Sequence, residues 1–221
     1  MPEEDGGRAD VRQPDGALSA GQGPSAFLLR WTLYVTAGET VGFAVAAAIA
    51  VGVTVLGLSD PARYPIVVAA GAAEGALLGT AQYLAMRESK PPPAAWIGST
   101  SAAAALAWAI GMLISLFGEL PAPPLLFLGA LVIIASIPVA QWAVLRRPHS
   151  FRWVPVNMGA WAIGLLWTFA PSPIIDETTP IPLVVLLYVI AGALMALTVA
   201  ALTAHTAGRL FGRESVRLMR A

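Results

Sequence analysis

The sequence predicts an all-α integral membrane protein, a six-transmembrane-helix bundle built of three repeated helical hairpins. Composition is the first reason: of 221 residues, 57% are hydrophobic and 12% are charged, whereas soluble domains carry about 25% charged residues. The second reason is a series of six long apolar runs. The third is a heptapeptide that closes one run and returns at the close of another.

Each apolar run is expected to form one helix. A helix needs about 20 residues to cross about 30 Å of hydrocarbon, and a backbone in lipid must satisfy its own hydrogen bonds. The fifth run is the shortest of the set. The runs occupy residues 27–58, 64–86, 95–117, 124–145, 153–170 and 181–204.

Polar segments flank this membrane domain, which is expected over residues 26–208. Residues 1–25 are rich in Gly, Pro, Asp and Arg, a composition typical of a disordered tail, which we expect in the cytoplasm. They hold no apolar core of a signal peptide, so the first run is expected to double as the insertion signal. Residues 209–221 are expected to form a basic cytoplasmic tail. The chain has no cysteine, which excludes disulfides and thiolate chemistry.

Basic residues are divided very unevenly between the two sides of the expected bundle. Arg63 alone falls on one side, whose loops are otherwise acidic and rich in proline. Because positively charged segments stay in the cytoplasm, we expect both termini there, in a bacterial cytoplasmic (inner) membrane. The residues on the cytoplasmic side are Arg8, Arg12, Arg30, Arg87, Lys90, Arg146, Arg147, Arg152, Arg209, Arg213, Arg217 and Arg220.

Two pairs of similar segments reveal an internal repeat. AQYLAMR at residues 81–87 returns as AQWAVLR at residues 140–146, and AWAIG occurs at residues 107–111 and 160–164. Such recurrence is typical of repeat architectures. We expect three hairpins at about residues 27–87, 95–146 and 153–208. Their parallel orientation implies a pseudo-symmetry axis along the membrane normal.

The repeated heptapeptide is interpreted as a helix-ending device. Arg87 and Arg146, with Arg209 on the sixth helix, are expected to anchor helix ends among the headgroups. The amides of Gln82 and Gln141 fall inside the apolar boundary, where they are expected to hydrogen-bond a neighbouring helix. Ligand binding by these amides is the alternative.

Small residues recur at four-residue spacing in several runs. Gly38 and Gly42 form one such pair, and Gly71, Gly75 and Gly79 form a longer series. This spacing lets helix backbones approach closely. The glycine faces are therefore expected to pack within one subunit, with homo-oligomerisation through the same faces as the alternative.

These motifs resemble uncharacterised multi-pass bacterial membrane proteins in which Gln-Trp-x-x-x-Arg and Gly/Ala-Trp-Ala-x-Gly segments recur. The resemblance covers most of the chain after residue 26. Glu39, at the first Trp position, and His205, at the last Gln position, depart from the pattern. The resemblance implies a membrane fold and no particular activity. The residues that carry it are Gln82, Arg87, Gln141, Trp142, Arg146 and both AWAIG segments.

Glu39 and Glu74 are acidic residues inside apolar runs. They lie nine residues from Arg30 and thirteen from Arg87, about 13 and 20 Å along a helix, so both are expected near mid-membrane on adjacent antiparallel helices. Intramembrane acids are functional candidates because a buried charge is costly. With Gln82 and Asn157 they form the candidate polar site. The alternative is a protonated carboxyl that only hydrogen-bonds a neighbour.

The sequence indicates no catalytic residues, no cofactor and no metal site, and we expect a protein that is not an enzyme. His205 is expected to cap a helix end or lie at the interface, and one histidine is too few for a typical zinc site. Ser99 and His205 fall on the same side, as in intramembrane serine proteases, but the fourth run lacks the Gly-x-Ser-Gly motif of those enzymes. The serines are better explained as polar contacts between helices.

Two functions remain open. The first is a small proton- or cation-coupled transporter or channel centred on Glu39 and Glu74. The second is a non-catalytic membrane scaffold or subunit, packed against itself or a partner membrane protein. Partners expected on either reading are the lipid bilayer and anionic inner-leaflet lipids, held by the C-terminal arginines, with no nucleic acid.

Overall fold

The computed structural model describes residues 24–87, 90–116 and 122–212, and these residues form helices with no strand. The bounds are α1 Pro24–Val55, α2 Asp60–Ala85, α3 Pro93–Leu116, α4 Pro123–Leu145, α5 Trp153–Gly164 and α6 Ile181–Phe211, with short 3₁₀ helices η1 Ser150–Arg152 and η2 Leu165–Phe169. Outside the described residues lie most of the expected N-terminal tail, the loop residue Glu119, and Arg213, Arg217 and Arg220 of the C-terminal tail.

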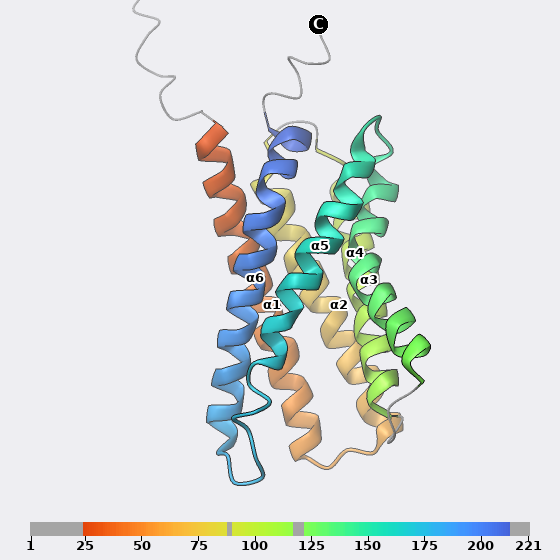
Figure 1. Cartoon of the computed structure of the whole chain (residues 1–221), viewed down its shortest axis with the longest axis vertical. Coiled ribbons are helices and arrows are strands. Elements are labelled where there is room, and N and C mark those ends of the chain that lie inside the picture. The colour runs from red at the N-terminus through yellow and green to blue at the C-terminus, as the bar shows by residue number, and fades with distance from the viewer. Residues whose placement is uncertain (1–23, 88–89, 117–121, 213–221) are drawn as a thin grey trace, which may run out of the picture.

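The helices form a closed ring. Each packs against its neighbours in the sequence, and α6 packs against α1. The start of α1 and the end of α6 lie at the same end of the bundle, at the top of Figure 1, which we call the termini end. The opposite end is the far end. This ring follows from short connections, which make consecutive helices antiparallel neighbours.

Five helices, α1 to α4 and α6, are long and apolar enough to cross a membrane. The fifth expected span differs from the expectation of one continuous α-helix over residues 153–170. Its α-helix has 12 residues and ends at Gly164, after which the chain tightens into η2. Pro171 and Pro173 follow closely, and a proline donates no backbone hydrogen bond and disfavours helix at the residue before it.

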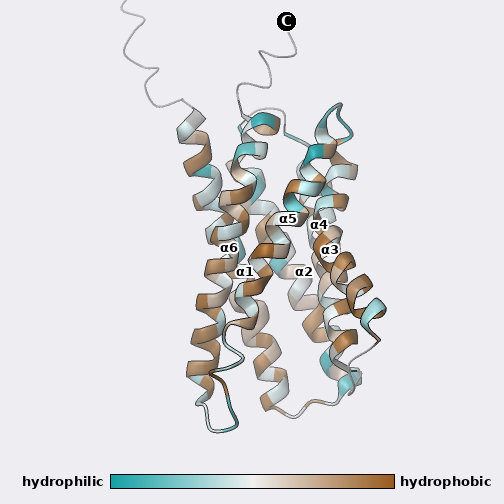
Figure 2. Ribbon diagram, in the orientation of Figure 1, coloured by the Kyte–Doolittle hydropathy of each residue, from teal (hydrophilic) through white to brown (hydrophobic). Residues whose placement is uncertain are grey.

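Large apolar side chains cover the outside of the ring. Leu33, Phe127 and Leu186 are 58%, 73% and 52% exposed, and Figure 2 shows brown apolar segments along the helices, with much of the teal at the termini end. An exposed apolar surface of this extent is unfavourable in water. The exterior is therefore suited to contact with lipid.

Glycines bring α2 close to both of its neighbours. A Cβ atom on Gly75 would lie 2.5 Å from the Cβ atom of Ala104 on α3, and one on Gly38 would lie 2.3 Å from the Cβ atom of Ala81. These contacts are shorter than real Cβ atoms allow, so only glycine fits. The glycine series of α1 and α2 thus packs within one chain.

Four aromatic side chains fill the ring near the termini end. Trp31, Trp96, Trp153 and Phe211 each have 0% exposure, and we call them the aromatic cluster. The Trp153 ring lies 6.0 Å from that of Trp31 and 6.3 Å from that of Trp96, between centroids. Aromatic pairs at this spacing add about 0.5–1.5 kcal/mol beyond area burial. The cluster therefore closes the ring interior on this side.

Candidate functional site

The carboxyl groups of Glu39 and Glu74 meet between α1 and α2. The two residues are 1% and 7% exposed, and their carboxyl groups lie close enough to interact electrostatically. Gly42 makes room for this contact, since a Cβ atom there would lie 3.2 Å from Cγ of Glu74. We call Glu39 and Glu74 the carboxyl pair.

Basic side chains on the same helices are engaged elsewhere. Arg63 forms an ion pair with Asp60, and Arg30 donates a hydrogen bond to the Leu84 carbonyl near the end of α2. Within the described part of the chain, no N–H or O–H donor reaches either carboxyl oxygen of Glu39. The carboxyl pair therefore has no basic partner among these residues.

Trp108 of α3 supplies a neutral donor to the pair. Its Nε1–H donates to Oε2 of Glu74 over 2.6 Å. The indole lies against Gly71, where a Cβ atom would come within 2.2 Å of Cδ1 of Trp108. Gly71 and Glu74 are on the same helix, so α2 both seats this indole and receives its hydrogen bond.

A cavity of about 540 Å³ borders this site. We call it the central cavity, because its walls come from all six α-helices. It runs from mid-helix residues such as Ala104 to Phe169 at the end of η2, whose side chain is 68% exposed. Of the carboxyl pair, Glu74 lines it. The lining residues are Phe43, Glu74, Ala104, Ala107, Trp108, Gly111, Ile133, Ile137, Trp161, Leu165, Thr168, Phe169, Tyr188 and Met195.

Gln82 does not line the central cavity. It accepts a hydrogen bond from Nε2 of Gln141 over 2.7 Å, and the same nitrogen donates to Oγ1 of Thr100 over 2.9 Å. Oε1 of Gln141 in turn accepts from Nε1 of Trp153 over 2.9 Å. We call Gln82, Thr100, Gln141 and Trp153 the glutamine network. It links α2, α3, α4 and α5 beside the aromatic cluster.

Asn157 lies on the inner face of α5 and is 1% exposed. The other buried residues of this helix are Trp153, Val154, Ala160, Trp161 and Gly164. Both amide atoms of Asn157 lack a hydrogen-bond partner among the described residues. The four expected site residues are thus all buried, but only Glu39 and Glu74 contact each other.

The expected helix-end residues occupy different environments. Arg146 is exposed and adopts a left-handed conformation at the end of α4, with φ of 45°. Arg87 donates its backbone N–H to the Phe211 carbonyl over 3.4 Å. Arg209 is exposed in the last turn of α6. Gln141, grouped with these anchors in the sequence analysis, is instead completely buried.

His205 does not take the place of the repeated glutamine. It is exposed on α6, whereas the buried polar residue nearby is Thr203, which accepts a hydrogen bond from Nε1 of Trp31 over 3.1 Å. The expected interhelical role of the α3 serines is seen at Ser101, which donates to the Ala72 carbonyl over 2.7 Å.

Sequence reasoning missed the role of several aromatic residues. Trp108 was visible only as part of the repeated AWAIG segment, and its counterpart Trp161 lines the same cavity. Phe43 and Tyr188 carried no motif. One usable signal was the position of Gly71, since a residue without a side chain opposite a tryptophan indicates where the indole can lie.

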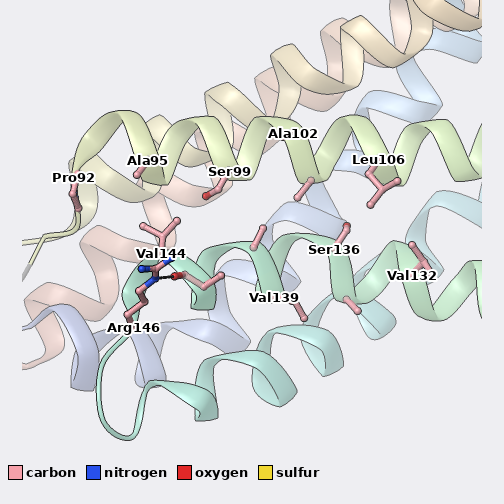
Figure 3. Close-up of a pocket in the computed structure, with 14 residues that line it drawn as sticks. Pro92, Ala95, Ser99, Ala102, Leu106, Val132, Ser136, Val139, Val144 and Arg146 are labelled. Atoms are coloured by element: carbon pink, nitrogen blue, oxygen red, sulfur yellow. Dashed lines mark hydrogen bonds between the residues drawn. The ribbon is translucent and has the colours of Figure 1, made fainter.

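A second hollow lies outside the ring between α3 and α4. This groove of about 890 Å³ is lined largely by small residues such as Ala95, Ser99 and Ala102, with Arg146 at one end. Figure 3 shows these side chains directed between the two helices. The lining of this groove does not include either residue of the carboxyl pair.

No protein-family model, curated protein or solved structure matches this chain. The described residues contain no group of three or more His, Asp and Glu side chains placed to hold a metal ion.

Proposed function

We propose that this protein is a small proton- or cation-coupled transporter or channel that works through the carboxyl pair. One observation carries the proposal: two buried carboxyl groups are in contact, without a basic partner among the described residues, at the wall of a cavity. Two unit charges about 4 Å apart repel by about 4 kcal/mol at an effective dielectric constant of about 20. The pair therefore favours holding a proton or a bound cation.

The arrangement along the bundle supports a transport role. The central cavity reaches toward the far end, while the aromatic cluster and the glutamine network fill the ring near the termini end. A buried acid beside a cavity that extends toward one end of the bundle, while side chains fill the other end, suits alternating access. In this proposal, movement of the aromatic cluster opens the second side.

Six membrane crossings are part of the proposal. The stretch formed by η1, α5 and η2 is continuous, and it measures about 34 Å at rises of about 1.5 and 2.0 Å per residue. This length exceeds the roughly 30 Å of hydrocarbon. Chemical labelling of single cysteines in the loops of intact cells tests the count, and the cysteine-free chain gives no background.

The same proposal places both termini in the cytoplasm of a bacterial cell. Arg30 and Arg209 lie in the helical turns of α1 and α6 at the termini end, and Arg87 and Arg146 directly follow α2 and α4 there, whereas Arg63 lies near the start of α2 at the far end. Positive charge is retained on the cytoplasmic side. Exposed arginines such as Arg209 then face the anionic inner leaflet.

Three parallel hairpins are also proposed. Trp31, Trp96 and Trp153 come from α1, α3 and α5, and all three are completely buried. Two of them donate to a polar residue on an even-numbered helix, Trp153 to Gln141 and Trp31 to Thr203. Equivalent positions meeting near one axis support a repeat whose pseudo-symmetry axis runs along the bundle.

Flux through reconstituted liposomes tests the transport proposal. An imposed potassium diffusion potential drives protons across the liposome membrane, and a pH-sensitive dye inside reports their entry. We expect Glu74→Gln and Glu39→Gln to abolish the proton flux seen with the unmodified chain. Glu177→Gln is the matched control, since Glu177 is exposed outside the helices. Equal flux in Glu74→Gln and the unmodified chain overturns the proposal.

A scaffold function is the second candidate, and the groove between α3 and α4 favours it. Small residues along a groove allow a further transmembrane helix, from a second copy or from a partner subunit, to approach closely. A cysteine at the exposed Ala102 should then crosslink in membranes. Crosslinking with intact flux supports oligomerisation alone, whereas crosslinking without any flux favours the scaffold.

A further inference from the structure

The central cavity combines aromatic walls with one carboxylate. Five of its lining residues are aromatic: Phe43, Trp108, Trp161, Phe169 and Tyr188. Glu74 is the single carboxylic acid among the lining residues, and no lysine, arginine or histidine is among them. The wall is therefore apolar over most of its area and carries its negative charge at one place.

This composition selects for a particular kind of cation. A cation within about 6 Å of an aromatic centroid is attracted by the ring, most strongly where water is absent. The rings of Phe43 and Trp108 lie beside each other at one wall, 6.4 Å apart between centroids. A hydrated metal ion gains little from such a wall, whereas an organic cation gains both from the rings and from the apolar surface.

The size of the cavity agrees with this chemistry. Its volume of about 540 Å³ falls within the roughly 300–1,000 Å³ of small-molecule sites. With one carboxylate in its wall, it offers too few oxygen ligands for a metal cation stripped of its water.

The position of Glu74 sets the orientation of such a ligand. Its Oε2 atom is held by the Trp108 indole over 2.6 Å, so the charge stays at the wall formed by α2 and α3. Phe43 packs against Gly192 of α6, where a Cβ atom would lie 2.2 Å from Cδ1 of the ring. Gly71 makes room for the Trp108 indole that holds Glu74, and Gly192 makes room for the Phe43 ring. The cavity wall therefore carries a carboxylate and an aromatic ring in fixed positions.

We propose that the central cavity binds a lipophilic organic cation, with the positive charge against Glu74 and the apolar body among Phe43, Trp108 and Trp161. This inference rests on the transport function proposed above and names its substrate class. Binding and proton release are linked, because the cation replaces the proton held by the carboxyl pair: the O–H bond breaks, the electron pair stays on oxygen, and the proton leaves to water.

Equilibrium binding of tetraphenylphosphonium to the purified full-length chain tests the inference. We expect saturable binding that tightens as pH rises, and release of protons into weak buffer. Triphenylphosphine oxide, a neutral molecule of similar shape, should compete poorly. Glu74→Gln should remove the proton release and weaken binding roughly thirtyfold or more, whereas Glu74→Asp should restore part of both.

Aromatic variants separate a binding role from a folding role. Phe43→Leu and Trp161→Leu should each weaken binding by about tenfold, the loss expected for one desolvated cation–π contact. Trp167→Phe and Glu177→Gln are controls outside the cavity and should bind as the unmodified chain does. Variants that elute as monodisperse folded protein but bind normally contradict the inference.

Failure of this inference is distinguishable from failure of the transport function. Absence of tetraphenylphosphonium binding, or equal binding by Glu74→Gln, overturns the substrate class. Proton flux that depends on Glu74 in the same preparation then leaves the transport function standing. If tetraphenylphosphonium binds and depends on Glu74 but no flux occurs, the cavity assignment holds and the coupled transport does not.

Discussion

The indole of Trp108 donates a hydrogen bond of 2.6 Å to Oε2 of Glu74, across the interface of α3 and α2. This contact connects an uncharged donor on α3 to a carboxyl group whose acidic partner, Glu39, comes from α1. Charge-assisted hydrogen bonds are roughly twice as strong as neutral ones. The hydrogen bond from Trp108 therefore orients the carboxylate of Glu74.

Replacing Trp108 by Phe keeps an aromatic ring and removes the donor. We expect the Glu74 carboxylate to lose about 1.5–3 kcal/mol of hydrogen-bond stabilisation, and proton flux in liposomes to fall clearly. Trp167→Phe is the matched control, because Trp167 also donates through Nε1, to Oγ1 of Thr198 over 3.1 Å, at an exposed position. Similar flux in the two variants would show that the indole does not orient Glu74.

Gly71 should tolerate no side chain. In Gly71→Ala the new Cβ atom meets Cδ1 of Trp108 at 2.2 Å, so the indole must move away from Glu74. We expect a loss of about 1–3 kcal/mol from overpacking and reduced flux. Gly98→Ala is the control on exposed helix surface, with no atom within 4 Å of the added Cβ, and it should gain stability from helix propensity. Thermal unfolding in detergent measures both.

Gln141 should matter more to folding than Gln82. Gln141→Leu leaves Trp153, Gln82 and Thr100 without their shared partner, and each unsatisfied buried group costs about 1–3 kcal/mol. Gln82→Leu removes one acceptor. We expect the double variant to be less destabilised than the sum of the single ones, as measured by a double-mutant cycle of unfolding free energies. Additive losses would contradict the network.

Asp176, in the loop before α6, should show a local response to acid. Hydrogen bonds from Oγ1 and N of Thr178, over 2.7 and 2.9 Å, and from Thr179 lower the pKa of Asp176 below its ordinary value. Because the folded pKa is depressed, the loop contacts persist above the ordinary pKa of about 3.9 and are lost as pH falls through the lower value.

The Thr178→Val variant should raise the pKa of Asp176 toward that of a free side chain. The carboxyl carbon shift of Asp176, followed by NMR titration, measures this change. Thr206→Val on α6 is the control, and it should leave the Asp176 titration unaltered. An unchanged Asp176 pKa in Thr178→Val would mean that the Thr178 hydroxyl does not hold the loop.

Local features of the fold were largely predictable. Apolar run length placed α2, α3 and α4 within a few residues of their observed bounds, because helix formation in lipid is dictated by backbone hydrogen bonding. The sixth run was expected to end at residue 204, but α6 continues to Phe211, since Phe211 packs into the aromatic cluster. The fifth run forms a shorter α-helix than its length suggests, because the chain tightens into a 3₁₀ helix before Pro171. Hydrophobicity alone does not reveal such a change.

The candidate site was only partly predictable. Counting residues from Arg30 and Arg87 placed Glu39 and Glu74 at similar depth on adjacent helices, and their side chains do meet. The same counting could not pair Trp108 with Glu74, because that contact depends on how α3 is rotated about its own axis. Nor could it separate Gln82 and Asn157 from the carboxyl pair, since a helix interior has several sides.

By itself, the sequence determined the helical, apolar character of this chain, the position of two acids well inside apolar helices and the division of its basic residues between two ends. Each of these depends on rise per residue or on transfer energy, which are local quantities. The tertiary structure decided which side chains share a space: the ring joined α6 to α1, brought Gln82 to Gln141 across 59 residues, and set Trp108 on Glu74. Those contacts depend on the separation and rotation of the helices, which glycine contacts between helices fix. Such contacts join residues far apart in the chain and cannot be read from the linear sequence.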